Sequence, residues 1–260
     1  MKQLLLFALG ITLLTACKKD NHSESNGIFA GPEVQVHDGK SRTWIQLNKQ
    51  GDPERIGVTL TDKVLTSVPV DGDGSGHNHG GTENNYILKF HPKGSVLPFD
   101  HVGLNWNPLG HEPLAIYGKP HFDFHFYMTT PQENATIPPY EVDKTKFDIF
   151  PAADYFPPTY FNPGGGVPQM GSHWLNATSP ELGGAPFGET FIYGSYNGKV
   201  TFYEPMITLD FLKANSNFSR PIPQAAKVQK TGWYPTIMKV NKHNGVTDII
   251  LDGFVYRTQS

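Results

Sequence analysis

The sequence contains a single cysteine, Cys17, among its 260 residues. The rest of the chain can therefore form no internal disulfide bond and no zinc or redox site built from paired cysteines. Charged residues are also scarce, since they make up 17% of the chain, where an average globular protein has about 25%. The net charge is −3, so the chain lacks the basic excess that binding to nucleic acid requires. We expect no nucleic-acid partner.

Several common catalytic motifs are missing as well. The sequence has no Gly-x-Ser-x-Gly, no phosphate-binding Walker loop and no Gly-x-Gly-x-x-Gly fingerprint, so it does not support nucleophilic or nucleotide-dependent catalysis. The chain does have 27 Gly, 22 Pro, 17 Phe, 11 Tyr and 4 Trp residues. The Gly and Pro content argues against long helices and coiled coils, and the aromatic content argues against global disorder.

The first residues resemble an export signal. Lys2 precedes an apolar run at 4–14, which is too short to span a hydrocarbon core of about 30 Å, and a small-residue cleavage site follows it. Leu-Thr-Ala-Cys (14–17) resembles the lipobox of bacterial lipoproteins, in which the peptide is cut before the cysteine and the cysteine is acylated. The resemblance implies a signal peptide at 1–16 and a lipid on Cys17. The alternative is an ordinary secretory signal without a lipid.

The next residues predict a tether and a location. Residues 17–27 comprise the cysteine and the polar stretch KKDNHSESNG, which has no apolar periodicity and is typical of a flexible linker. Lys18-Lys19-Asp20 resembles the charged stretch that directs some lipoproteins to the cell surface, although a solvated linker explains the same residues. We expect a protein anchored by its lipid to a membrane of the bacterial cell envelope, at the outer membrane or the cell surface.

Residues 28–260 predict one mainly β domain, an antiparallel sandwich or barrel with long Pro/Gly-rich loops and one or two short helices. Asn197-Gly198 and Asn244-Gly245 each lie between two apolar runs and predict β-hairpins with type I′ turns. A helix is expected at 209–214 and a single turn near Ser179, and the Pro/Gly-rich stretch 131–186 is expected to pack over the sheet. The predicted strands are 43–47, 55–60, 86–90, 101–106, 121–127, 190–193, 199–203, 236–240 and 247–256.

One segment combines aromatic residues with potential metal ligands. In Pro-His-Phe-Asp-Phe-His-Phe-Tyr (120–127), a strand places His121, Asp123, His125 and Tyr127 on one face and three phenylalanines on the other. Three alternating phenylalanines are typical of a core face. The polar face is therefore expected to line a pocket or a surface.

Strand geometry limits which of these side chains can share an ion. Residues two apart in a strand lie about 6.7 Å apart and residues four apart about 13 Å, whereas a histidine nitrogen binds zinc at about 2.0–2.1 Å. His121 with Asp123, or Asp123 with His125, can share one ion. His121 and His125 can do so only if the strand bends or bulges. An alternative leaves one histidine as the ligand and has Asp123 orient its ring.

Further candidate ligands lie elsewhere in the chain. His111 and Glu112 occupy a turn after a strand, His173 follows Gly171, which would allow close approach of the backbone, and Glu204 interrupts an otherwise apolar strand face. A buried unpaired carboxylate is costly, so Glu204 is expected to have a cation or a hydrogen-bond partner. Imidazoles with carboxylates suit Zn²⁺, Mn²⁺, Fe²⁺ or Cu²⁺. The predicted metal ligands are His111, Glu112, His121, Asp123, His125, His173 and Glu204.

Five short motifs between residues 98 and 212 share a further property. They are Gly-His-Glu-Pro (110–113), the Pro-His-Phe-Asp-Phe-His-Phe-Tyr run (120–127), Met-Gly-Ser-His-Trp (170–174), Phe-Ile-Tyr-Gly (191–194) and Phe-Tyr-Glu-Pro-Met (202–206). Together they resemble a bacterial family of unknown function, the TTHB-type domain. The resemblance implies an exported, oligomeric domain and that these segments form one site, but it implies no activity.

Two functional hypotheses follow from the sequence. In the first, a lipid-anchored envelope protein holds a divalent transition metal in a pocket and acts as a metal-dependent hydrolase or oxidoreductase, with water acidified by the ion. In the second, the same histidines and carboxylates form a structural polar network. The protein is then a non-catalytic module that binds a small molecule or assembles with further copies of itself.

Overall fold

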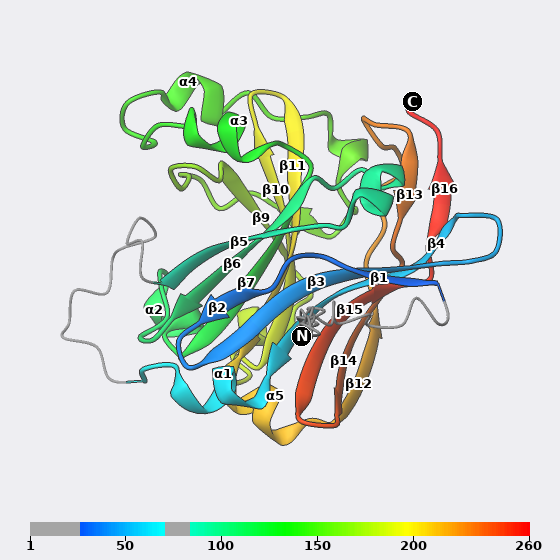
Figure 1. The fold of residues 1–260 in the computed structure, drawn as a ribbon. Coiled ribbons are helices and arrows are strands. Elements are labelled where there is room, and N and C mark those ends of the chain that lie inside the picture. The colour runs from blue at the N-terminus through cyan, green and yellow to red at the C-terminus, as the bar shows by residue number, and fades with distance from the viewer. Residues whose placement is uncertain (1–26, 71–83) are drawn as a thin grey trace, which may run out of the picture.

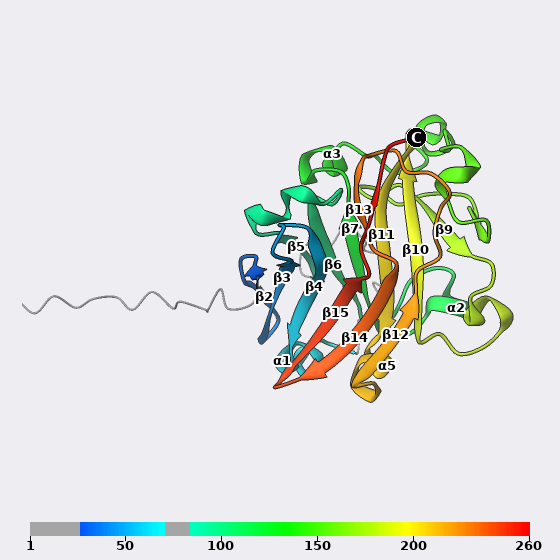
Figure 2. The same cartoon turned by 90° about the vertical axis from the view of Figure 1, so that its right-hand side faces the viewer.

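The computed structural model describes residues 27–70 and 84–260. The predicted signal peptide, the predicted lipidation site at Cys17 and the tether up to residue 26 lie outside the described residues. From residue 27 onward the chain folds into two antiparallel β-sheets that face each other (Figures 1 and 2). The two sheets do not join into one closed sheet, so the fold is the predicted sandwich and not the barrel.

The first sheet combines strands from the beginning and the end of the chain. Blue N-terminal strands lie beside orange and red C-terminal strands in Figure 1, and β4 pairs with β15 at the centre of the sheet. The strand order is β1-β3-β4-β15-β14-β12, and β2 pairs with β3. The bounds are β1 Ile28–Ala30, β2 Val34–Val36, β3 Gly39–Leu47, β4 Pro53–Thr61, β12 Asn217–Pro221, β14 Ile237–His243 and β15 Val246–Asp252.

The second sheet comes from the middle of the chain, in green and yellow in Figure 1. Its order is β5-β6-β7-β11-β10-β9-β8, so β7, which carries the predicted metal ligands, lies in its interior. The bounds are β5 Asn85–Lys89, β6 His101–Asn107, β7 His121–Tyr127, β8 Tyr160–Phe161, β9 Ser172–Asn176, β10 Glu189–Tyr196 and β11 Lys199–Thr208. A separate pair consists of β13 (Gly232–Tyr234) and β16 (Val255–Arg257).

The main core lies between the two sheets. Phe122, Phe124 and Phe126 of β7 are fully buried in one cluster with Ile45 of β3 and Val58 of β4. This arrangement confirms that the phenylalanine face of β7 is the core face. The other face of β7 therefore points away from the first sheet.

The outward face of the second sheet is also covered. Phe202 and Met206 of β11 belong to a second buried cluster with Tyr117, Met170 and Phe187, which come from the loops and short helices outside the sheet. The Pro/Gly-rich stretch thus packs over the sheet as the sequence predicts. As a result, the outward face of β7 is shielded from solvent.

Both predicted Asn-Gly hairpins are present. Asn197 and Gly198 have φ angles of 49° and 77°, and Asn244 and Gly245 have 46° and 79°. Positive φ at both central residues is the requirement of a type I′ turn. The first turn joins β10 to β11 and the second joins β14 to β15.

The described residues form five short α-helices, where the sequence indicated one or two. The predicted helix α5 is capped by the Thr208 side chain, which accepts a hydrogen bond from the Phe211 amide, and the turn expected near Ser179 is the 3₁₀ helix η4. Within 27–70 and 84–260, no helix is long and apolar enough to cross a bilayer. The bounds are α1 Asp62–Ser67, α2 Leu114–Tyr117, α3 Pro131–Ala135, α4 Lys144–Phe147, α5 Leu209–Ala214, η2 Pro92–Val96, η3 Ala153–Tyr155 and η4 Pro180–Gly183.

Candidate functional site

The outward face of β7 carries three polar side chains that are almost inaccessible to solvent. His121, Asp123 and His125 each expose 1% or less of their surface. Burying such groups is costly unless each one finds a partner. Their partners come from the loop before β7 and from β9 and β11, and they divide the predicted ligands into two groups.

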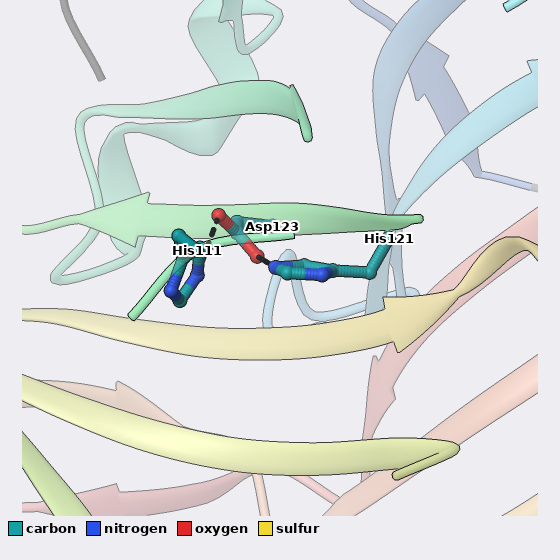
Figure 3. A group of neighbouring side chains, drawn as sticks. All are labelled: His111, His121 and Asp123. Carbon is teal, nitrogen blue, oxygen red and sulfur yellow. Dashed lines mark ion pairs between the residues drawn. The ribbon is translucent and has the colours of Figure 1, made fainter. Parts of the chain in front are cut away.

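The first group consists of His111, His121 and Asp123. Figure 3 shows the Asp123 carboxylate between the two imidazole rings. The distance from His121 Nε2 to Asp123 Oδ1 is 3.2 Å, and that from His111 Nε2 to Asp123 Oδ2 is 3.7 Å. Ligand atoms on a tetrahedral ion with bonds of 2.0–2.2 Å lie roughly 3.4 Å apart. The spacing of this group therefore suits a single ion.

His111 reaches β7 because the loop before α2 turns back on itself. Gly110 has a φ of 73°, and a Cβ at this position would lie 2.1 Å from the Tyr117 carbonyl oxygen. Only glycine fits that close approach and that conformation. The His111 amide then donates to the Tyr117 carbonyl at 3.3 Å, which holds the histidine over the end of β7.

Backbone carbonyls determine which ring nitrogen of each histidine faces Asp123. His121 Nδ1 lies 2.7 Å from the Lys119 carbonyl oxygen, and His111 Nδ1 lies 2.9 Å from the Glu112 carbonyl oxygen. A carbonyl oxygen can only accept a hydrogen bond, so both Nδ1 atoms carry the proton. When the rings are neutral, each Nε2 atom then directs its lone pair at the carboxylate. Metal-binding histidines are oriented in the same way, by a hydrogen bond that the other ring nitrogen donates.

Asn107 is a member of this site that our sequence reasoning did not select. Its side-chain amide donates to Asp123 Oδ2 at 2.7 Å. Asn107 ends β6 directly opposite His121 in the strand ladder. The detectable signal was its place at the end of a strand neighbouring β7, but that pairing is long-range. The amide fixes the orientation of the carboxylate toward the histidines.

The pKa values of the two carboxyl groups on this face are shifted in opposite directions. Burial acts to raise the pKa of Asp123, but the adjacent His121 and His111 outweigh it and hold that pKa well below its ordinary value. Burial likewise acts to lower the pKa of His111, and Asp123 outweighs it so that the pKa is raised. Burial and the nearby Asp123 charge raise the pKa of Glu204 well above its ordinary value.

The second group consists of His125, His173 and Glu204. His125 Nε2 lies 3.3 Å from Glu204 Oε1, and His173 Nε2 lies 3.7 Å from Glu204 Oε2. In the pairing of β7 with β11, Tyr203 lies opposite Phe126 and Met206 opposite Asp123, and this register brings Glu204 alongside His125. The aromatic rings of Tyr127 and Phe202 contact the His125 ring, at centroid distances of 5.3 and 4.8 Å, and fix its position.

His173 is placed by the close approach predicted for Gly171. This glycine has a φ of 113°, and a Cβ on it would lie 2.4 Å from the Ser195 carbonyl oxygen. The contact brings the start of β9 against β10, where His173 pairs with Gly194. The Asn162 side chain donates to the His173 carbonyl at 2.9 Å. His173 thereby overlies β11 from a segment 31 residues before Glu204 in the chain.

The structure thus brings six of the seven predicted ligands into two groups of three, in place of the single pocket that we expected. Glu112 joins neither group. Its side chain is exposed and accepts a hydrogen bond from the Leu114 amide at 3.0 Å, at the start of α2. The first amide groups of a helix have no hydrogen-bond acceptor within the helix, which explains why the Glu112 side chain lies there.

A cavity of about 290 Å³ lies on the same face of the sheet. Residues of β6 that face outward, namely His101, Gly103 and Asn105, contribute to its wall together with Tyr127 of β7. In the strand ladder Gly103 lies opposite His125, and Asn105 lies opposite Asp123. The cavity therefore lies beside β7, although none of the six ligands lines it. Its lining residues include no lysine, arginine, aspartate or glutamate.

The raised pKa of Glu204 predicts how the stability of metal-free protein depends on pH. The folded state keeps a proton on Glu204 above the ordinary pKa of 4.5, whereas the unfolded state releases it. The contribution of Glu204 to the free energy of unfolding is therefore complete below the ordinary pKa. It is lost as pH rises toward the folded-state pKa, at about 1.4 kcal/mol per pH unit. The Glu204→Gln variant, measured by thermal unfolding in chelator between pH 4 and 9, is expected to show no such decline in stability with rising pH. Parallel curves for the two proteins would contradict the prediction.

Comparisons with models of protein families, with curated proteins and with solved structures find no match to this chain.

Proposed function

We propose that this chain is a lipid-anchored protein of the bacterial cell envelope that holds a divalent transition metal between His111, His121 and Asp123. One observation supports the metal most directly. His121 Nε2 and Asp123 Oδ1 are both buried and lie 3.2 Å apart, yet neither makes a hydrogen bond with any described residue. Two acceptor atoms in contact require a cation or a proton between them. A metal ion satisfies both of them and His111 together.

Two histidines and one carboxylate favour certain ions and certain chemistry. This donor set occurs in zinc hydrolases and in non-haem iron oxygenases, so Zn²⁺, Fe²⁺, Mn²⁺ and Cu²⁺ are the candidate ions. A bound ion would supply a Lewis acid that polarises a ligand and acidifies water. The chain itself would contribute the fixed carboxylate, the two oriented rings and the surrounding apolar cover. We propose a metal-dependent hydrolase or oxidoreductase.

The adjacent cavity is the proposed location of a small-molecule substrate. Its volume is close to the lower end of the roughly 300–1,000 Å³ that is usual for ligand pockets. Asn105, which lines it, is largely buried, and its Oδ1 atom makes no hydrogen bond with the described residues. That oxygen can accept a hydrogen bond from a hydroxyl or amide group of a ligand. The absence of charged groups from the lining favours a neutral molecule.

A second candidate function follows from the charges of the first group. A network of histidines that donate protons to Asp123 would satisfy the same atoms without a metal, and the raised pKa of His111 favours protonation of that ring. The site would then be structural, in a binding module or in a subunit of a homo-oligomer. The two functions differ in one property, because only the first requires metal.

Metal content and chelation distinguish the two functions. We expect untagged protein to contain stoichiometric Zn, Fe, Mn or Cu by elemental analysis. At a free-ion concentration of 100 times Kd, the metal should stabilise the fold by about 2.7 kcal/mol, which corresponds to a rise in Tm of about 5–10 °C for a chain of this size. Metal-free preparations whose Tm is unchanged when each of the four ions is added would establish the structural network instead.

A further inference from the structure

The second group has the composition and spacing of an independent metal site. His125, His173 and Glu204 offer two imidazole nitrogens and one carboxylate, all within 4.8 Å of one another. The two separations in the structure, 3.3 and 3.7 Å, bracket the roughly 3.4 Å expected between ligand atoms of a tetrahedral ion. The first group has nearly the same separations. The structure therefore repeats one donor arrangement twice on the same sheet face.

Glu204 is a buried carboxyl group whose ion-pair partners among the described residues are two histidines. Its side chain is 1% exposed and lies in an apolar row of β11 between Phe202 and Met206, which are both fully buried. Its Oε2 atom makes no hydrogen bond with the described residues. No lysine or arginine of residues 27–70 and 84–260 forms an ion pair with it. A carboxylate is an expensive choice for such a position unless it binds an ion.

The two groups are separate sets of ligand atoms. Within each group the three ligand atoms lie within 4.8 Å of one another, and no such group among the described residues combines members of both. The two groups also draw their third ligands from opposite directions. His111 comes from the loop before α2, and His173 comes from β9 on the far side of β10 and β11.

We propose that His125, His173 and Glu204 form a second, separate centre for a divalent transition metal such as Zn²⁺, so that the domain binds two ions that share no ligand. The centre ties β9 to β7 and β11 across the sheet. Of its three ligands only His173 is substantially exposed, at 21% of its side chain. The ion would enter past that ring and then be shielded by Phe202 and Tyr127. The inference does not depend on the first centre or on its proposed activity.

Counting bound Zn²⁺ in single variants tests the second centre. Untagged full-length protein is stripped with chelator, loaded with Zn²⁺, freed of excess ion and analysed for zinc per chain. We expect two ions in the unaltered protein, one in Glu204→Gln, one in His121→Ala and none in the double variant. His173→Gln changes the most exposed ligand, so it provides a second test with the least risk to folding. His243→Ala is the control, because His243 pairs with Asp248 on the first sheet and should leave both ions in place.

The outcomes distinguish this proposal from the previous one. If the unaltered protein binds one ion, and that ion is kept in Glu204→Gln and His173→Gln but lost in His121→Ala, the second centre is refuted and the first remains. If that ion is lost in all three variants, the chain has a single shared centre and the second centre is again refuted. One ion lost only in the Glu204 and His173 variants would support the second centre and refute the first. Circular dichroism of each variant shows whether the chain is still folded, so that a loss of bound zinc can be assigned to the loss of a ligand.

Discussion

Replacing Asp123 with asparagine is expected to reduce the affinity of the first centre for Zn²⁺ by more than 100-fold. Asparagine keeps the shape and the contact with Asn107, but it removes the negative charge and one oxygen ligand. Loss of a group that only orients a metal ligand already costs about 10–100-fold in metal affinity, and a direct ligand should cost more. Competition between the protein and a chromogenic zinc chelator measures the change.

The same substitution should also change the titration of His111 in metal-free protein. Burial acts to lower the pKa of His111, and Asp123 is the largest of the groups that raise it. Without that charge only the smaller effects of the Glu112 carbonyl and carboxylate oppose burial, so the pKa of His111 should fall. Nuclear magnetic resonance of the ring protons follows this directly. A His111 pKa that stays raised in Asp123→Asn would mean that another group supplies the charge.

Asp248→Asn is the matched control for both measurements. Asp248 also accepts a hydrogen bond from a histidine, His243 Nε2, at 2.8 Å and is largely buried, but it lies on the first sheet. Its replacement removes one carboxylate from the same kind of pair without touching either centre. Zinc affinity and the His111 titration should therefore match those of the unaltered protein. An equal effect of the two substitutions would indicate a general electrostatic change and not a lost ligand.

Truncating Phe124 to alanine is expected to lower the free energy of unfolding by about 3–5 kcal/mol, the usual cost of removing a large aromatic side chain from a core. Phe124 is fully buried between the two sheets in the main cluster. For a chain of this length the loss corresponds to a fall in Tm of about 6–20 °C. Urea unfolding of metal-free protein measures it without a contribution from bound ions.

Phe161→Ala provides the comparison for the core substitution. Phe161 is 42% exposed and lies at the edge of the second sheet in β8, so its removal should change stability by only about 0.5 kcal/mol. A loss below 1 kcal/mol for Phe124→Ala would show that the face of β7 assigned to the core is wrong. In that case the orientation of His121, Asp123 and His125 would also be wrong.

The local pattern of the sequence predicts the longer strands and their faces, but it misses the short strands β1, β2, β8, β9, β12 and β13 and joins β15 and β16 into one. The alternation in β7 and the two Asn-Gly turns depend on neighbouring residues only, so they can be recognised without a partner strand. The additional helices had a local signal too. Thr130 and Glu133 form a capping box at the start of α3, and the spacing Thr-x-x-Glu is readable in the sequence.

The division of the ligands into two groups could not be predicted in this way. It depends on where the loop carrying His111 returns to β7, and on β9 placing His173 over β11. Both are long-range arrangements controlled by contacts of Gly110 and Gly171 with distant backbone. The burial of the polar face has the same origin. The pattern of β7 shows that this face is not the core face, but only the packing of Tyr117 and Phe187 makes it inaccessible.

The central pairing of the first sheet has a consequence for the order of folding. Thr61 of β4 pairs with Val246 of β15, so this ladder joins two parts of the chain separated by nearly the whole domain. While the chain is being synthesised, β4 has no permanent neighbour on that side until almost the last residues emerge. Contacts of such long range form slowly, and an open strand edge readily pairs with other chains. A chain that ended before Val246 would keep all six ligands of the two groups and yet expose one side of the sandwich core.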